Sequence, residues 1–436
     1  MESRGTDRGR RERMRRRTSN PVAGNPRTEI FASSTAAAGA RPREEEITMV
    51  LRRCTSARRS RLLVGLLATG TLVLTGCSSS DGGSAPSASG GVGFVASASV
   101  VQEAKQRDRT PPVLAANPAV AGKNVAILSL SQANESGAVP AAAAKEAAEI
   151  IGWKATIYDA NSNMGAVTGL VRQATAAGAN ALIVVNIDCA AAAQAFREAT
   201  AAGVVIVPVN GFDCDNEGSP GGPSARGFSG EIRPGGGLNQ SQFWAQDGSD
   251  QAHNAIADSE DTAKIISVES TELAVEYWQA KGFNEAVAAS GGSRVVQRVE
   301  FTTADFVSGR LTTMIEAALT RHPEATYIKS AFSASTIANV VPAVRASHSK
   351  IKILGGEGLQ SEFDLLRKGQ MLSTDATPGS WFGWAAVDTV NSLFRKTPPN
   401  DSGLQWMLVD RDNVPSTGTV QTADFRTVYR ASWGVS

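Results

Sequence analysis

The chain has 436 residues and a formal net charge of +1 at pH 7. That length is too great for one ordinary domain and predicts about two, with room for a sizeable core. A net charge this close to zero gives no basic field for nucleic acid, and the arginines concentrate toward the N-terminus rather than over a folded face. We therefore expect no nucleic-acid partner.

Residues 1–48 are rich in arginine, serine and alanine and show little apolar periodicity, so we expect no fold there. A basic arm that binds nucleic acid is one interpretation of this extension. The interpretation that we favour is a start at Met49, because the residues after it have the pattern of a secretory signal, which belongs at an N-terminus.

Residues 49–76 have the order of such a signal, with a basic region followed by an apolar run over 62–74. The run is too short for a permanent membrane span. It ends in Leu74-Thr75-Gly76-Cys77, which resembles the bacterial lipoprotein box, where cleavage leaves the cysteine first and its sulfur carries a diacylglycerol. We predict export, by the Sec or the twin-arginine route, and a lipid anchor on Cys77 at the outer face of the cytoplasmic membrane.

Residues 77–122 have the composition of a flexible tether. Glycine and serine come first, and Pro111, Pro112 and Pro118 keep the later part extended. One short helix is predicted near residues 100–106.

The folded part begins with one unit repeated over residues 123–209: an apolar strand, a polar turn, an alanine-rich helix and a glycine. Right-handed crossovers between such strands give an α/β domain with an open, doubly wound parallel sheet, whose ligands lie at the carboxyl ends of the strands. The strands are predicted at 125–130, 155–158, 181–185 and 204–209. The glycines suited to the left-handed C-cap are Gly152, Gly178 and Gly203.

Polar side chains gather at those carboxyl ends. Turn formation alone favours such residues there. Because the ends of parallel strands share one edge of the sheet, the group as a whole predicts a binding cleft. Its members are Gln132, Asn134, Glu135, Asn161, Asn163, Asp188, Asn210 and Asp213.

A glycine- and proline-rich passage over 218–237, with a fifth strand predicted at 225–231, leads into a second α/β set. Two consecutive domains of the same type, each with its own strand-end edge, predict a cleft between them. The second set has predicted helices at 238–257, 271–289, 304–321 and 334–346, and predicted strands at 263–268, 294–299, 326–329 and 350–354.

Several short runs follow one another in this region: Ala147-Ala148 with Gly152, Gly178-Ala179-Asn180-Ala181-Leu182-Ile183-Val184, Gly203-Val204-Val205-Ile206, Gly282-Phe283, Leu354-Gly355-Gly356-Glu357-Gly358 and Asp412-Asn413-Val414-Pro415. In this order they resemble the type I periplasmic binding proteins, the ribose-binding kind of solute receptor for ATP-driven sugar importers. The resemblance implies two lobes joined by a hinge that the chain crosses three times. The implied lobes are 123–231 with 378–404, and 232–377 with 405–436.

The chain departs from that family at the ligand site. The family's sugar binders have an aspartate where Asn210 stands, an arginine where Gln279 stands, an Asn-Asp pair where Ala334-Ser335 stands, and an aspartate where Glu357 stands. The carboxylate and arginine that grip adjacent sugar hydroxyls are therefore missing. The expected fold is unaffected, and a sugar is the first candidate among small polar ligands.

An indole against the ligand face would offset part of that loss. Trp381 lies just past the implied hinge crossing at Thr377, with core packing as the alternative role. We predict that the following residues contact the ligand: Asn134, Asp188, Asn210, Glu269, Gln279, Glu357 and Trp381.

No enzyme motif accompanies this pattern. The first strand is not followed by G-x-G-x-x-G, there is no G-x-S-x-G or H-E-x-x-H, and the three histidines lie away from the predicted cleft. We expect no catalysis, cofactor or metal. The predicted protein is a monomeric solute-binding lipoprotein that closes on a small polar ligand and presents it to an ABC permease, and the alternative is a ligand-sensing lipoprotein without a transport role.

The cysteines give a further prediction. Cys54 leaves with the signal and Cys77 carries lipid, so Cys189 and Cys214 meet the oxidising exterior. They follow the third and fourth strands, whose ends lie about 4.8 Å apart if the strands are neighbours, within reach of the ~4.4–6.8 Å between α-carbons in a disulfide. We predict this disulfide, with two buried free thiols or a metal pair as the alternatives.

Overall fold

The computed structural model describes residues 92–107, 110–420 and 423–436. Four predictions fall outside the described residues. They are the N-terminal extension, the signal with Cys54, lipid attachment at Cys77 and the tether as far as residue 91. Within the described ranges, no helix combines the length and the apolar character that a membrane crossing requires.

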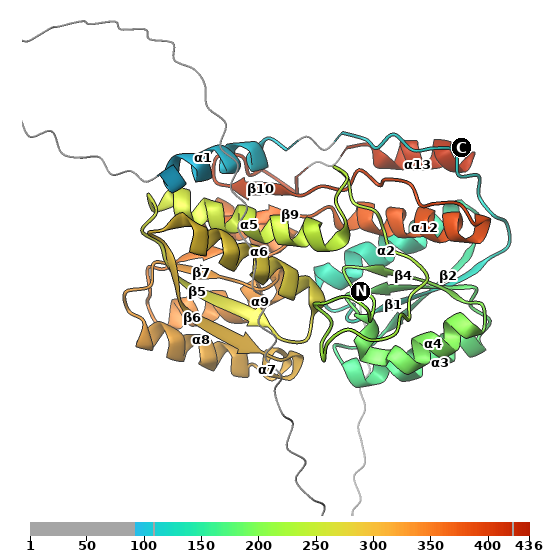
Figure 1. The fold of residues 1–436 in the computed structure, drawn as a ribbon, viewed down its shortest axis with the longest axis horizontal. Coiled ribbons are helices and arrows are strands. Elements are labelled where there is room, and N and C mark those ends of the chain that lie inside the picture. Colours follow the sequence, from blue (N-terminus) through green and yellow to red (C-terminus); the bar gives the residue numbers. More distant parts are fainter. Residues whose placement is uncertain (1–91, 108–109, 421–422) are drawn as a thin grey trace, which may run out of the picture. The chain divides into compact units, whose positions relative to one another are not determined.

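Four parallel strands form the first sheet, in the order β2-β1-β3-β4 (Figure 1). The runs of Val, Ile and Leu in β1, β3 and β4 suit strands that are covered on both faces, whereas the edge strand β2 has no buried residue. The strands are β1 (Asn124–Ser129), β2 (Lys154–Asp159), β3 (Ala181–Val185) and β4 (Val205–Val209), and the connecting helices are α2 (Glu135–Ile150), α3 (Val167–Ala176) and α4 (Ala193–Ala201). We call this sheet and its helices the first lobe.

The predicted C-cap glycines have the conformation that the pattern requires, with φ of 79° at Gly152, 81° at Gly178 and 87° at Gly203. Each lets its helix end and turn toward the next strand without the strain that a Cβ would bring. The predicted parallel α/β class is confirmed, and β3 and β4 are neighbours as expected.

The second sheet has six strands in the order β10-β9-β8-β7-β5-β6, and β10 pairs antiparallel with β9. We call this sheet and its helices the second lobe. The strands are β5 (Lys264–Ser270), β6 (Arg294–Phe301), β7 (Tyr327–Lys329), β8 (Lys352–Leu354), β9 (Ser373–Ala376) and β10 (Met407–Asp410). The helices are α5 (Gln240–Asp258), α6 (Ala274–Ser290), α7 (Thr303–Val307), α8 (Arg310–Arg321), α9 (Ser333–Ser335), α10 (Val341–Ala346) and α11 (Gln360–Arg367).

The fifth strand predicted at 225–231 is wrong, because the structure has an irregular loop there. Ser229 N donates to the Ile206 carbonyl at 2.9 Å, but Ile206 N donates to the Ser229 hydroxyl at 3.0 Å. The Ser229 hydroxyl thus accepts the hydrogen bond from β4 that a backbone carbonyl of a fifth strand would otherwise accept.

The C-terminal helix differs from the expectation that the second lobe takes the tail. After β9, α12 (Gly379–Arg395) returns to pack on α2, and after β10, α13 (Phe425–Trp433) packs on α12. The Trp384 and Trp433 rings stack with centroids 5.3 Å apart, and Phe425, Tyr429 and Trp433 are buried in the core of the first lobe. Apolar residues on one face of α13 explain this placement.

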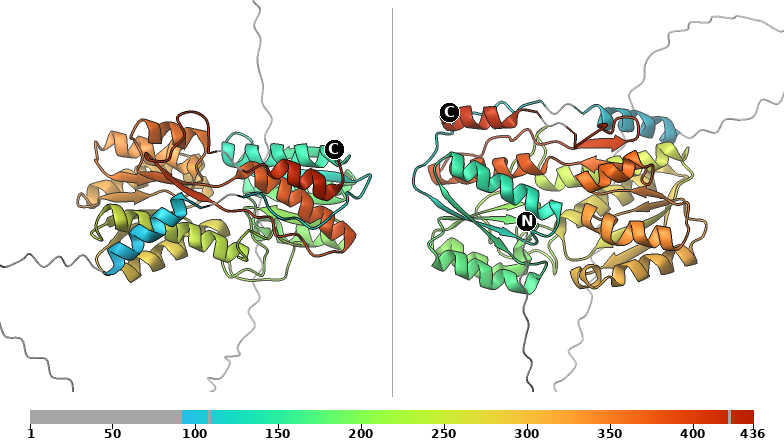
Figure 2. Two further views of the ribbon diagram at one scale, coloured as in Figure 1. Left: turned by 90° about the horizontal axis from the view of Figure 1, so that it is seen from above. Right: turned by 180° about the vertical axis from the view of Figure 1, so that it is seen from behind.

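The N-terminal segment also differs from the expected tether. Helix α1 (Val92–Lys105) packs on α5 and β10 of the second lobe, where Val101 and Ala104 are buried. Residues 110–122 then run along the first lobe, and Asn117 Nδ2 donates to Asp388 on α12 at 2.7 Å. Figure 2 shows both terminal segments against the folded body. The described chain therefore passes between the lobes before β1 and again after β10, in addition to the three expected crossings.

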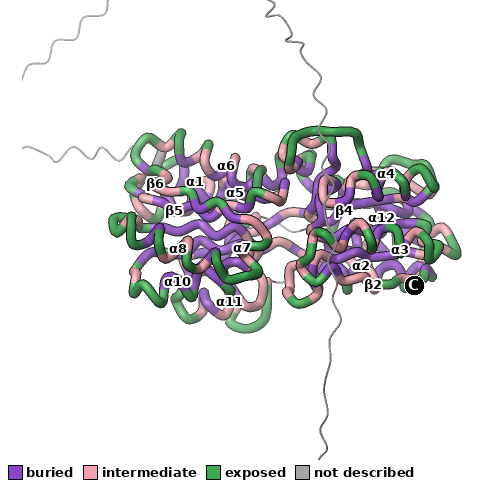
Figure 3. Tube along the Cα trace, turned by 90° about the horizontal axis from the view of Figure 1, so that it is seen from below, coloured by how far each residue is buried: buried purple, intermediate pink, exposed green. Residues whose placement is uncertain are grey.

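Burial follows the two sheets. Strands β1, β3, β4, β5, β7 and β9 are almost continuously buried, whereas the edge strands β2 and β6 are largely intermediate or exposed. Other exposed residues concentrate in the outer loops and on helix surfaces (Figure 3). Helix α12 is buried along most of its length, because α2 covers one side of it and α13 another.

Helices α5 and α6 cross closely through a reciprocal pair of glycines. A Cβ on Gly282 would lie 1.8 Å from the Ala245 carbonyl oxygen, and one on Gly248 would lie 2.0 Å from the Gln279 carbonyl oxygen. Neither neighbour is a flexible side chain, so backbone must move to admit even a methyl group.

We expect Gly282→Ala to lower the free energy of unfolding by about 3 kcal/mol, because overpacking at this backbone contact must separate the two helices. Urea unfolding followed by circular dichroism measures the change. Gly169→Ala in α3 is the matched control, since nothing lies within 4 Å of the added Cβ. That control should keep or slightly raise the stability. Equal midpoints for Gly282→Ala and the wild type would contradict the close crossing.

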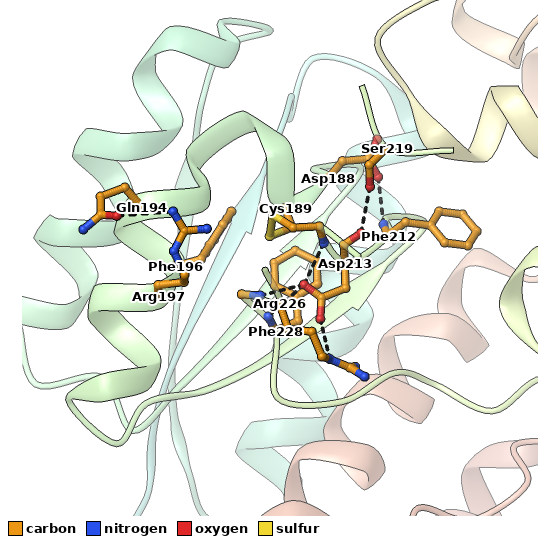
Figure 4. The surroundings of a disulfide bond; sticks show 12 residues. Asp188, Cys189, Gln194, Phe196, Arg197, Phe212, Asp213, Ser219, Arg226 and Phe228 are labelled. Carbon is orange, nitrogen blue, oxygen red and sulfur yellow. Dashed lines mark hydrogen bonds and ion pairs between the residues drawn. A yellow bond between two sulfur atoms is a disulfide. The ribbon is translucent and has the colours of Figure 1, made fainter. Parts of the chain in front are cut away.

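Cys189 and Cys214 form a disulfide between the loops that follow β3 and β4, with α-carbons 5.0 Å apart (Figure 4). These two sulfurs and an Asp213 oxygen lie within 4.8 Å of one another, but the sulfurs are bonded to each other. The Asp213 carboxylate accepts from the backbone N–H of Cys214, Gly227 and Phe228. The free-thiol and metal alternatives therefore do not hold.

Candidate functional site

A cavity lies between the carboxyl ends of the strands of the two lobes. The first lobe contributes Leu130, Ser131, Asn134, Ser136, Ser162, Asn186 and Asn210 to its lining. The second lobe contributes Trp244, Ser270, Leu273, Val275, Glu276, Gln279, Phe301, Thr303, Phe306, Phe332, Ala334 and Glu357.

Asn134 has two roles at the end of β1. Its Oδ1 accepts from Gly137 N at 3.0 Å, which caps the N-terminus of α2, and the same residue lines the cavity. Asn134 can therefore cap the helix and also border the cavity, as its position after β1 allows.

Asn186 and Asn210 follow β3 and β4 directly and lie at equivalent register positions, since Val185 pairs with Val209. Both have the left-handed backbone, with φ of 56° and 50°, which asparagine tolerates better than most residues. Asn210 Oδ1 is buried and has no hydrogen-bond partner among the described residues. A ligand donor at this position would satisfy it.

Aromatic side chains of the second lobe form an apolar wall. Phe301 ends β6, Phe306 lies on α7 and Phe332 follows β7. The Phe306 and Phe332 rings meet edge to face with centroids 5.4 Å apart. Trp244 on α5 also lines the cavity, and its buried Nε1 finds no acceptor in the described part of the chain. The wall suits the flat face of a small ring, and the indole offers a donor.

Glu357 and Gln279 are two predicted ligand residues that line the cavity. Glu357 accepts from the Ser136 hydroxyl at 2.7 Å and from Ser333 N at 3.0 Å, and burial raises its pKa. Gln279 Nε2 donates to Asp247 at 2.5 Å, and its buried Oε1 has no partner among the described residues. Gln279 thus presents an amide oxygen that is open to a ligand donor.

Carboxylates of the first lobe bind helix N-termini of the second. Asp188 accepts from Ala274 N, the first residue of α6, at 2.7 Å, and also from Phe212 N of its own lobe at 2.7 Å. Glu135 accepts from Gln360 N, the first residue of α11, at 3.0 Å. Burial raises the pKa of Asp188 to about 6. These contacts join the lobes at two helix ends, where the helix dipole favours negative charge.

A group of buried charges in the second lobe includes Glu276, which lines the cavity. Asp247 and Asp250 on α5, Glu276 on α6 and Asp375 on β9 are nearly inaccessible to solvent. The buried cations are Lys329, 4.0 Å from Glu276, and Arg107, 2.8 Å from Asp250. Burial raises the pKa of all four carboxyl groups.

Three of the predicted ligand residues do not line the cavity. Asp188 is held by the two backbone donors described above. Glu269 accepts from Asn284 Nδ2 at 3.2 Å and lines a separate surface depression. Trp381 is 0% exposed and stacks on Phe425 at 5.2 Å, because α13 covers the start of α12. Asn134, Asn210, Gln279 and Glu357 do line it.

Several lining residues had been missed. Asn186 could have been found, because it directly follows β3 just as Asn210 follows β4. Trp244 and Glu276 carry no such signal, since both lie within long helices whose facing surface depends on tertiary packing. The same holds for Phe306, which lies on the short helix α7.

Two α/β lobes that meet across a polar and aromatic cavity define a two-lobed binding protein. The family model described as periplasmic binding protein domain matches residues 125–397. The chain therefore belongs to this family, whose members are solute-binding proteins rather than enzymes. The comparison with curated proteins gave no match.

Solved structures share the fold at low identity. A glucose-galactose binding protein from Geobacillus stearothermophilus is 17% identical with a TM-score of 0.56, covering 67% of this chain and 99% of its own. A solute-binding protein from Agrobacterium vitis, bound with α-D-tagatopyranose, is 16% identical with a TM-score of 0.59, covering 69% and 99%. A periplasmic ribose ABC transporter protein from Conexibacter woesei is 19% identical with a TM-score of 0.54, covering 68% and 95%.

Proposed function

We propose that this protein is the solute-binding lipoprotein of an ABC importer, and that it captures a sugar or sugar-like molecule in the cavity between its lobes. One observation carries the proposal. The cavity is enclosed by both lobes, and its walls combine an aromatic surface with amide and carboxylate groups. Such a mixture suits a small ring that bears several hydroxyl groups. The α-D-tagatopyranose bound to the Agrobacterium vitis protein, and the ribose named for the Conexibacter woesei transporter, support this class of ligand.

In this proposal the lobes close around the ligand by a hinge motion, and a permease recognises the closed form. The contacts from Asp188 to α6 and from Glu135 to α11 form only when the lobes meet, so they stabilise the closed form. A ligand that touches both lobes shifts the population in the same direction.

The proposed location is the outer face of the cytoplasmic membrane, with the lipid on Cys77. The signal pattern before Cys77 supports export. The disulfide between Cys189 and Cys214 supports it independently, because such bonds persist in oxidising compartments.

Calorimetry with the purified protein and a panel of pentoses, hexoses, polyols, nucleosides and amino derivatives of the sugars tests the function. We expect at least one member to bind at micromolar concentration or below. Asn210→Ala should weaken that binding, because the buried Oδ1 would no longer be available to the ligand. A panel without any binder would overturn the proposed ligand class.

A further inference from the structure

The cavity has an unusual balance of charge. Of the described residues that line it, the ionisable ones are Glu276 and Glu357, and none is lysine, arginine or histidine. A neutral sugar is commonly held by carboxylates and cations together, since each grips a different hydroxyl. Here the lining offers two carboxyl groups and no basic side chain to pair with them.

The two lining carboxylates differ in how they are satisfied. Glu357 already accepts from the Ser136 hydroxyl and from Ser333 N. Glu276 is 3% exposed, and its Oε2 has no hydrogen-bond partner among the described residues. Lys329 Nζ lies 4.0 Å from that oxygen, beyond hydrogen-bond distance, and is not a lining residue. Glu276 is thus a buried acceptor that borders the cavity and remains open to a donor.

The charges behind Glu276 compensate for it only in part, through the ion pair with Lys329 at 4.0 Å. The described buried group contains four carboxyl groups, from Glu276, Asp247, Asp250 and Asp375, but its cations are Lys329 and Arg107. Arg107 forms an ion pair with Asp250, and its guanidinium carbon lies 4.2 Å from the centroid of the Trp406 ring. A buried excess of carboxyl groups is costly unless it takes up protons or meets a further cation.

The aromatic wall is compatible with such a cation. Trp244, Phe301, Phe306 and Phe332 border the same cavity as Glu276. Aromatic faces attract cations electrostatically, and the attraction is stronger in a site that excludes water.

We propose that the ligand carries a protonated amino group on a polyhydroxylated ring, as in an amino sugar, and that its ammonium binds Glu276. This inference rests on the proposed function and narrows its ligand class. The hydroxyl groups meet the amides of Asn210 and Gln279, the ring lies on the aromatic wall, and the ammonium supplies the charge that the buried carboxyl groups lack.

The pH dependence of binding follows from the groups that face Glu276. They are Lys329 on β7, Asp247 on α5, Glu269 on β5 and Glu357 after β8. Burial raises the pKa of Glu276 to about 8, so the free protein holds a proton there at neutral pH. An ammonium binds the ionised form and must displace this proton. Its affinity should therefore rise with pH, by up to about tenfold per unit between pH 6 and 7.5, whereas that of a neutral sugar should not.

Calorimetry with matched pairs tests the proposal: D-glucosamine and 6-amino-6-deoxy-D-glucose against D-glucose, and D-galactosamine against D-galactose. In at least one pair the amine should bind at least about tenfold more tightly than its parent sugar. Glu276→Gln should weaken binding of that amine by about 30-fold or more, the effect of removing one charge from a buried pair. Binding of the parent sugar should change little.

Glu285→Gln is the matched control, because it removes the same charge from an exposed position of α6. It should leave both affinities unchanged. If Glu276→Gln fails to fold, the pH dependence of amine binding to the wild type tests the inference instead. Parent sugars that bind as tightly as the amines, or amine binding that does not vary with pH, would overturn the inference and leave the proposed function standing. Failure of every amine and every neutral sugar would overturn both.

Discussion

Replacing Cys189 and Cys214 together by serine is expected to lower the free energy of unfolding by about 3 kcal/mol. The disulfide joins residues 25 positions apart, and losing it returns the conformational entropy of that loop to the unfolded chain. It also fixes the loops that hold Asp188 and Asp213 (Figure 4). Urea unfolding under non-reducing conditions measures the difference.

A reductant separates this effect from any effect of the serine side chains. Dithiothreitol should destabilise the wild type by a similar amount and leave the double variant unchanged. If the double variant unfolds at the same urea concentration as the oxidised wild type, the disulfide contributes no stability and the prediction is wrong.

Asp188→Asn should weaken ligand binding by about tenfold to a hundredfold. The carboxylate accepts two backbone N–H groups, one from each lobe, and the isosteric amide presents an NH2 group to one of them. Hydrogen bonds to a charged group contribute about 1.5–3 kcal/mol each, and the bond to Ala274 N exists only while the lobes are in contact. Calorimetry with the tightest-binding member of the sugar panel measures the loss.

Asp213→Asn is the matched control for that prediction. Asp213 is another buried carboxylate of the first lobe, but its backbone donors, Cys214, Gly227 and Phe228, belong to the same lobe. This variant should lose stability and keep its affinity for ligand. An equal loss of affinity in both variants would show that Asp188 acts through general stability rather than through closure.

The sequence was sufficient to predict the repeating core. Apolar strands alternating with helices that end at Gly152, Gly178 and Gly203 are local signals, and each acts within a few residues. Placement of the terminal segments depended on tertiary packing instead. The burial of Val101 requires α5 and β10, and the burial of Trp433 requires α12, so neither could be derived from local pattern.

The site residues also divide into those that a local sequence signal predicts and those that only tertiary packing places. Asn134 and Asn210 could be predicted because they follow strands whose carboxyl ends share an edge. Glu276 and Trp244 could not, because a helix presents a different face at each position and only the crossing of α5 with α6 decides which face borders the cavity. Trp381 lies outside the cavity lining for the related reason that α13 covers it.

Small-angle X-ray scattering with and without ligand tests the central claim, that two lobes close on one small molecule. The purified protein would be measured alone and with saturating amounts of the tightest-binding member of the sugar panel. We predict a smaller radius of gyration in the presence of ligand, and an intermediate response for Asp188→Asn at the same ligand concentration. An unchanged radius of gyration at confirmed saturation would contradict closure by a hinge motion.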